Sequence, residues 1–436
     1  MAKRPARLQP ETADSPPKRD RASGDGSAQA AERVKTPEPP SASIPTLAVL
    51  ALILAVSLIP RLATLQRVTM PSGEVVYRHF EGDERVFREL VQRVRTSFFD
   101  YSMHGSPQLG ELNPANYDLP IFFHPPAFVY TARLLWFLPL PLVPVLMNLV
   151  TIALVFALGR RLYDDECGLW AALLVALCPV TWFMSQKIWI DNMLVMMVAA
   201  SMVATMYAAD RGRVWAYALA GAIFGLTYLT KVAAILILPS LAVLAFHRDD
   251  RRRGAAKVAA FAIPAALMVG WWQLTLKAYN GVWSPSAFPD AGVVAAVPFT
   301  ALVVDRPWYF YVINLVEITP VYLLALGAAL RRRAHELPVV LWVVAFWIGA
   351  TMFGLRGGGY QTRYLAPAYP ALALLAAATI ARFRVPGLGL VVALAGYGMM
   401  NALMYAVLDT PGLADFQFSA ASILLEKITK IGTFGQ

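Results

Sequence analysis

Carboxylates and histidines gather in one polar stretch near the start of the chain. Glu81-Gly82-Asp83-Glu84 supplies three carboxylates within four residues, and three of the five histidines lie around it at His79, His104 and His124. A positioned carboxylate can take a proton from an attacking hydroxyl, and a histidine can carry charge or bind a metal. An Asp-Glu pair is also common as a solvated surface feature, so its surroundings decide between the two interpretations.

Other ionisable residues stand singly beside apolar runs: Asp191, Lys231, Arg363 (followed by Tyr364) and Glu317. An ionisable group near a membrane is costly, which makes each of them a candidate for function. There are simpler interpretations. Lys231 and Arg363 could extend their charges to the membrane surface, and Asp191 could offset the dipole of a helix that begins there.

The composition indicates a membrane protein. Of the 436 residues, 58% are hydrophobic and 15% charged, with a mean hydropathy of +0.53. Repeated apolar runs of near-bilayer length predict an all-α polytopic protein with about eleven transmembrane helices. The net charge of +10 comes from short basic clusters between these runs, so it indicates membrane orientation and not nucleic-acid binding.

The basic clusters fall on alternate connections, which are therefore expected to be cytoplasmic. This orientation predicts a disordered cytoplasmic tail over 1–43, a membrane domain over 44–407 and a short extracytoplasmic tail over 408–436. A large first extracytoplasmic loop covers 61–118. The expected spans are 44–60, 139–158, 169–184, 192–209, 214–230, 232–246, 256–276, 308–330, 337–355, 365–381 and 386–407.

Six short motifs occur in a fixed order along the chain. They are GDERVFRELVQRV, HPPAFVYTARLL, GRRLYDDECGLWAALLVALCP, IDNMLV, YLTK and TRYLAPAYPALALLAA. Their order resembles that of the GT-C membrane glycosyltransferases, particularly the polyprenyl-phosphate-sugar users related to aminoarabinose transferase and protein O-mannosyltransferase. The resemblance covers about 45–407, and it implies an active site on the outer face of a bacterial inner membrane.

The resemblance also implies roles for individual residues. Asp83, with Glu84 beside it, corresponds to the catalytic or acceptor-orienting carboxylate. Lys231 corresponds to a basic residue of the family, and Arg363 with Tyr364 corresponds to a pair that holds the lipid phosphate. His124 stands before two prolines where the relatives often have a lysine that contacts the donor phosphate.

This chemistry suits the residue types. A sugar that leaves a lipid phosphate needs fixed positive charge against the leaving group, and one carboxylate can orient or deprotonate the acceptor. One principal carboxylate favours a single displacement with inversion. The expected partners are a polyprenyl-phosphate-linked sugar, membrane lipids and an acceptor that is a lipid, a glycan or a protein.

The sequence leaves open two other functions and the question of a bound metal. A transporter or flippase of lipid-linked sugar would use the same basic groups without bond breaking and would place ionisable groups near mid-span, where Glu317 is the main candidate. A non-catalytic scaffold would leave the loop carboxylates dispensable. For the enzyme, a divalent cation could bind Asp83, Glu84 and His104, although their spacing fits no fixed ligand pattern.

Overall fold

The computed structural model describes residues 43–63, 65, 67–69, 75–77, 83–105, 119–246, 251–281, 283, 308–331, 333–355, 360–383 and 385–408. All of them belong to one structural unit, 40–436. The two expected tails, 1–43 and 408–436, lie outside the described residues except for Ser43 and Leu408, so their assignment stays a prediction.

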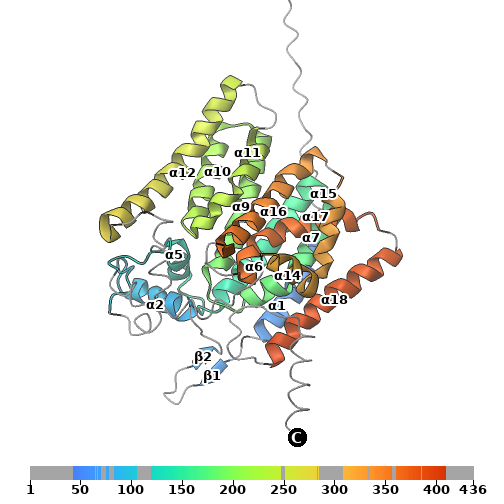
Figure 1. Cartoon of the computed structure of the whole chain (residues 1–436), viewed down its shortest axis with the longest axis horizontal. Helices are drawn as coiled ribbons and strands as arrows, with labels where there is room; N and C mark the ends of the chain where they lie inside the picture. The colour runs from blue at the N-terminus through green and yellow to red at the C-terminus, as the bar shows by residue number, and fades with distance from the viewer. Residues whose placement is uncertain are drawn as a thin grey trace, which may run out of the picture. The chain divides into compact units, whose positions relative to one another are not determined.

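Long apolar helices dominate the described part of the chain (Figure 1). Four of them are long and apolar enough to cross a membrane, and a fifth crossing results if one bent helix pair counts as a single span. The four are α1 (Ile44–Ala63), α6 (Leu142–Leu162), α9 (Ile190–Arg211) and α12 (Arg251–Asn280). The helical membrane architecture is therefore confirmed, while the number of eleven spans stays a prediction.

Several expected spans are broken into shorter pieces. Span 169–184 divides into α7 (Asp165–Ala176) and α8 (Pro179–Met184), because Cys178 is extended before Pro179. Span 308–330 bends by 103° at Pro320. The remaining pieces are η1 (Val232–Ile237), α11 (Leu238–Phe246), α14 (Phe310–Ile318), η3 (Pro320–Leu324), α15 (Ala325–Ala329), η4 (Ala334–Glu336), η6 (Thr362–Ala368) and α17 (Tyr369–Ile380).

Helix α17 lies at the centre of the bundle. Every residue of α17 is buried, and the helix packs against α7, α15 and α16 (Leu337–Phe353), as Figure 1 shows. Close approach elsewhere depends on glycine. A side chain at Gly159 of α6 would meet the backbone of Gly168 of α7 at 2.8 Å, so only a residue without a Cβ fits this crossing.

The basic clusters gather at one end of the bundle. Arg161 at the end of α6 pairs with Asp210 near the end of α9 at 2.6 Å, and Arg331 donates to the carbonyl oxygen of Ala378 at 3.1 Å. Helix α9 has 22 residues and begins at Ile190, so its first turn lies about 33 Å from that end. Charged groups at the start of α9 therefore belong to the opposite end.

The first loop carries its own small elements. Strands β1 (Arg67–Thr69) and β2 (Val75–Tyr77) pair antiparallel, a short addition to the otherwise helical fold. Helix α2 (Asp83–Thr96) buries one apolar face against α5 (Ala127–Leu134), where the rings of Phe87 and Phe128 meet edge to face at 5.7 Å. The remaining helices are α10 (Val214–Tyr228), which packs against α9 and α12, and α18 (Val385–Leu408).

Candidate functional site

The first charged pair of the site joins the polar loop to the late part of the chain. Helix α2 begins at Asp83, and Oδ2 of Asp83 lies 2.7 Å from Nη1 of Arg363 in η6. The Asp83 side chain is 35% exposed and that of Arg363 11%. Nε of Arg363 also donates to Oε1 of Gln361 at 2.6 Å, which fixes the direction of the guanidinium. A partly exposed carboxylate thus lies against a nearly buried cation.

The second charged pair joins two membrane helices. Asp191 is the second residue of α9, and Lys231 lies between α10 and η1. Their side chains meet at 2.7 Å, with Asp191 4% and Lys231 21% exposed. The two simpler interpretations, a helix-dipole role for Asp191 and a membrane-surface position for Lys231 and Arg363, are therefore incomplete. Asp191 does lie at a helix N-terminus, where the dipole favours it, but it also holds Lys231, and neither Lys231 nor Arg363 merely extends to the surface.

Aromatic rings connect the two pairs. The ring centroid of Tyr364 lies 5.3 Å from Nζ of Lys231 and 5.5 Å from Cζ of Arg363. Arg363 also lies over the ring of Trp189, at 4.5 Å. A ring within about 6 Å attracts a cation, so Tyr364 helps to hold both positive charges near one place. The structure brings together five of the residues that the sequence predicted: Asp83, Asp191, Lys231, Arg363 and Tyr364.

His124 lies beside these groups in aromatic surroundings. Its ring contacts Phe123 at 4.3 Å and Phe122 at 5.4 Å, and its carbonyl oxygen accepts a hydrogen bond from the Tyr101 hydroxyl at 3.0 Å. Burial and the Lys231 charge lower the pKa of His124 to about 4, against the opposing effect of Asp83. In the absence of donor the imidazole is therefore neutral at pH 7, and it supplies no charge of the kind a lysine would.

Asp83 keeps its charge in spite of its surroundings. Burial alone would raise its pKa, but the charge and hydrogen bond of Arg363, with smaller effects of His124 and Lys231, hold the pKa below the ordinary value. Asp83 is therefore a carboxylate at neutral pH, able to accept a hydrogen bond or a proton from an acceptor hydroxyl.

Glu84 turns away from the site. Adjacent residues of a helix point about 100° apart, so Glu84 faces the protein interior while Asp83 faces Arg363. Its two carboxylate oxygens accept from Nζ of Lys187 at 3.1 Å and from the backbone N–H of Ile188 at 2.9 Å. A carboxylate buried in this way does not reach an acceptor beside Asp83. The geometry therefore favours a structural role for Glu84 over the expected catalytic one.

The described residues hold no ready metal site. No group of three or more His, Cys, Asp or Glu side chains in the described ranges lies close enough together to bind an ion. The Glu84 carboxylate binds Lys187. At His104 the backbone carbonyl oxygen, and not the imidazole, accepts a hydrogen bond from Arg93 at 3.0 Å. His79 and Glu81 lie outside the described residues, as does the side chain of Glu317 in α14.

The sequence did not single out two residues that shape the site. Lys187 and Trp189 belong to the segment before α9, and Asn192 of α9 fixes this segment by donating from Nδ2 to the carbonyl oxygens of Met184, Lys187 and Trp189 at 2.9, 3.0 and 3.3 Å. A lone lysine four positions before an aspartate at a helix start was the only available signal.

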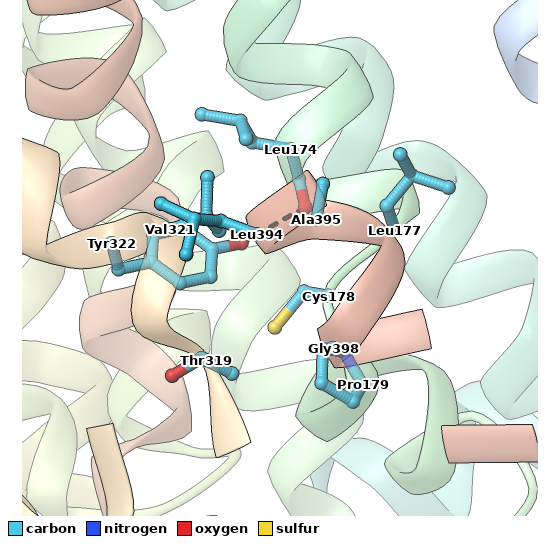
Figure 2. Close-up of a pocket in the computed structure, with 10 residues that line it drawn as sticks. All are labelled: Leu174, Leu177, Cys178, Pro179, Thr319, Val321, Tyr322, Leu394, Ala395 and Gly398. Carbon is cyan, nitrogen blue, oxygen red and sulfur yellow. Dashed lines mark hydrogen bonds between the residues drawn. The ribbon is translucent and has the colours of Figure 1, made fainter. Parts of the chain in front are cut away.

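A small cavity elsewhere in the bundle is not part of this site. Figure 2 shows it between the α7–α8 junction, η3 and α18, with Cys178, Thr319 and Tyr322 among the residues that line it. The Tyr322 hydroxyl donates to the carbonyl oxygen of Leu174 at 2.9 Å. None of the charged residues described above lines this space.

Comparison with known proteins supports the resemblance seen in the sequence. Residues 124–272 match the family described as dolichyl-phosphate-mannose-protein mannosyltransferase. A curated protein of Pseudomonas aeruginosa (strain UCBPP-PA14), undecaprenyl phosphate-alpha-4-amino-4-deoxy-L-arabinose arabinosyl transferase, is 31% identical over 307 residues, which make up 64% of this chain and 54% of that protein. The chain thus spans about half the length of the curated relatives it matches.

Solved structures extend the similarity to most of the fold. The crystal structure of ArnT from Cupriavidus metallidurans in the apo state matches with a TM-score of 0.58 at 16% identity, over 86% of this chain and 67% of that one. The same protein bound to undecaprenyl phosphate matches with a TM-score of 0.56 at 17% identity, over 83% and 70% of the two chains.

The fold and the matches together define the class of this protein. It is a polytopic membrane protein of the GT-C type. Within that class it is similar to the aminoarabinose transferases and, over residues 124–272, to the protein mannosyltransferases, the two groups that the sequence motifs resemble.

Proposed function

We propose that this chain transfers a sugar from a polyprenyl-phosphate carrier to an acceptor on the extracytoplasmic face, with inversion at the sugar. One observation carries the proposal: two aspartate–cation pairs meet around Tyr364 at one end of the bundle. Two cations beside a partly exposed carboxylate match the needs of a reaction that expels a phosphate and activates a hydroxyl.

Lys231 and Arg363 would hold the donor phosphate. The guanidinium can bind phosphate oxygens in two parallel hydrogen bonds, and the ammonium can act as a point charge. Both cations are already positioned by carboxylates at 2.7 Å and by the Tyr364 ring, so little reorganisation is needed when the donor phosphodiester enters as a monoanion and its phosphate leaves as a dianion. As the bond between the anomeric carbon and the phosphate oxygen breaks, its electron pair passes to that oxygen, where these charges stabilise it.

Asp83 would act on the acceptor. The acceptor oxygen forms its bond to the anomeric carbon from the face opposite the phosphate, and its proton goes to the Asp83 carboxylate. A retaining route needs a second carboxylate close to the sugar. Among the described residues, Glu84 is held by Lys187 and Asp191 is buried against Lys231, so Asp83 is the carboxylate that remains for one displacement.

The site is proposed to face the extracytoplasmic side. The Arg161–Asp210 pair and the neighbouring Arg331 lie at the opposite end of the bundle, and positive charge is enriched at the cytoplasmic ends of spans. The charged pairs of the site therefore belong to the outer end, in a membrane that corresponds to a bacterial inner membrane.

The transport alternative has less support. Transport of an anionic substrate would place ionisable groups near the middle of spans, often at broken helices in repeated units. The four charged groups lie instead at helix ends: Asp83 begins α2, Asp191 is in the first turn of α9, Lys231 precedes η1, and Arg363 precedes α17.

The direct test uses the purified chain in lipid nanodiscs. It is incubated with undecaprenyl-phosphate-linked aminoarabinose, the donor named for the similar proteins, or with a mannosyl polyprenyl phosphate, and with an envelope extract that supplies lipid, glycan and protein acceptors. Mass spectrometry should show free polyprenyl phosphate and a glycosylated acceptor with one of the donors. In closed proteoliposomes, movement of the intact donor across the bilayer without release of polyprenyl phosphate would instead support the flippase. A comparison of the two donors also decides whether a pentose or a hexose is transferred.

A further inference from the structure

The segment before α9, residues 185–189, contacts Arg363 and the residue that follows Asp83 in α2. At one end of the segment, Lys187 and the N–H of Ile188 bind the Glu84 carboxylate, which directly follows Asp83 in α2. Two residues further on, the Trp189 ring lies 4.5 Å from Cζ of Arg363. One short piece of chain therefore contacts both the start of α2 beside Asp83 and the guanidinium that pairs with Asp83.

This segment is itself held in place. The Asn192 amide donates to the carbonyl oxygens of Lys187 and Trp189 within the segment and of Met184 just before it. The Ser185 hydroxyl donates to the carbonyl oxygen of Trp182 at 2.5 Å. The Lys187 and Glu84 side chains are only 7% and 3% exposed. A buried ion pair is often no more stable than an apolar pair of similar size, but it does fix the direction of both side chains.

We propose that Glu84 and Lys187 form a positioning pair, which fixes the start of α2 so that Asp83 faces the acceptor and Arg363. The inference rests on the proposed function, because it gives the pair a task in the same reaction. Neither residue reaches the reacting atoms. Their effect passes through Asp83, so it should fall on the chemical step more than on donor binding.

The test compares single variants with a matched control. Glu84→Gln keeps an oxygen for the Ile188 N–H but loses the charge, Lys187→Met removes the cation, and Lys187→Arg keeps it. We expect the first two to lower kcat by about tenfold to a hundredfold with the donor KM within about threefold, and Lys187→Arg to recover most of the loss. Lys257→Met is the control, because Lys257 is also a buried lysine, in contact with Tyr217 and remote from the site.

A double-mutant cycle separates positioning from general stability. In an Asp83→Asn background, Glu84→Gln should lower single-turnover release of polyprenyl phosphate by less than about threefold, because the group that it positions is already disabled. The same factor of loss in both backgrounds would mean that the pair does not act through Asp83, and it would overturn the proposal. If Lys187→Met fails to fold, the comparison of Glu84→Gln with Lys187→Arg decides.

A second measurement does not depend on activity. Hydrogen exchange of the α2 amides, Asp83–Thr96, should be about tenfold faster in Glu84→Gln than in the unmodified chain and unchanged in Lys257→Met. Unchanged α2 exchange in Glu84→Gln would overturn the positioning role. If no lipid-linked sugar is turned over by the unmodified chain, the proposed function fails, and exchange alone then decides whether the pair anchors α2.

Discussion

Asp83 and Arg363 form an ion pair of 2.7 Å although 280 positions separate them in the sequence. The pair connects the first turn of α2 in the loop to η6 before the central helix α17. Each partner stands at the position where the proposed reaction needs its charge. Substitutions at the two positions should therefore have different effects, one on turnover and the other on donor binding.

Asp83→Asn should stop turnover while leaving the donor site intact. We expect kcat to fall by about a hundredfold or more, because the amide cannot take the acceptor proton, and binding of undecaprenyl phosphate to stay near normal. The control is Asp210→Asn, which removes an aspartate from an arginine pair at the other end of the bundle. Unchanged turnover in Asp83→Asn would exclude Asp83 as the catalytic carboxylate.

Lys231→Ala and Arg363→Ala should weaken donor binding. Each removes a charge-assisted contact to phosphate, so we expect the Kd of undecaprenyl phosphate to rise by about tenfold or more in nanodiscs. Arg161→Ala, which breaks the remote Arg161–Asp210 pair, should leave the Kd unchanged. Equal affinities in all three variants would contradict the phosphate site.

The pH at which kcat/KM falls on the acid side should depend on the Asp83–Arg363 ion pair. Arg363 holds the Asp83 pKa below its ordinary value, so activity should not fall through Asp83 protonation until the pH drops below that value. In Arg363→Ala, burial raises the pKa without opposition from the guanidinium, and the acid limb should move to higher pH. The profiles are measured with and without His124→Asn, since His124 titrates near pH 4. Superimposable acid limbs would contradict the coupling.

His124 should contribute no charge to donor binding. With a pKa lowered to about 4 by burial and by Lys231, the imidazole is already neutral at pH 6 and stays so up to pH 9. The donor Kd should therefore follow the same pH curve in the unmodified chain and in His124→Asn over that range. The opposite result would be a loss of donor affinity at alkaline pH that disappears in His124→Asn and is flattened in His124→Lys. It would show that the bound phosphate raises the pKa of His124 enough to protonate the imidazole.

Orientation can be measured by labelling from outside intact cells. In a chain with Cys167 and Cys178 changed to alanine, a cysteine in place of exposed Phe99, three residues after the first-loop helix α2, should react with an impermeant thiol reagent. A cysteine in place of Arg213, at the basic end, should react only after the membrane is opened. The reverse pattern would place the active site in the cytoplasm.

The membrane class, the helical architecture and the identity of most charged residues of the site could be predicted from the sequence. Apolar runs and isolated charges are local properties, so Asp83, Asp191, Lys231 and Arg363 could be chosen without coordinates. Periodicity does not show where a run breaks, which is why the bend at Pro320 and the division before Pro179 differ from the expected spans.

Which charges face each other could be seen only in the folded protein. The direction in which Glu84 points depends on the phase of α2 and on the distant segment that holds Lys187, and no local pattern encodes that contact. The same holds for the charge of His124, because its pKa depends on burial and on Lys231, which lies 107 positions later in the chain numbering. Ion pairing and burial depend on all the residues that folding brings together. The sequence therefore supplies the charged groups, and their packing in the folded protein determines their roles.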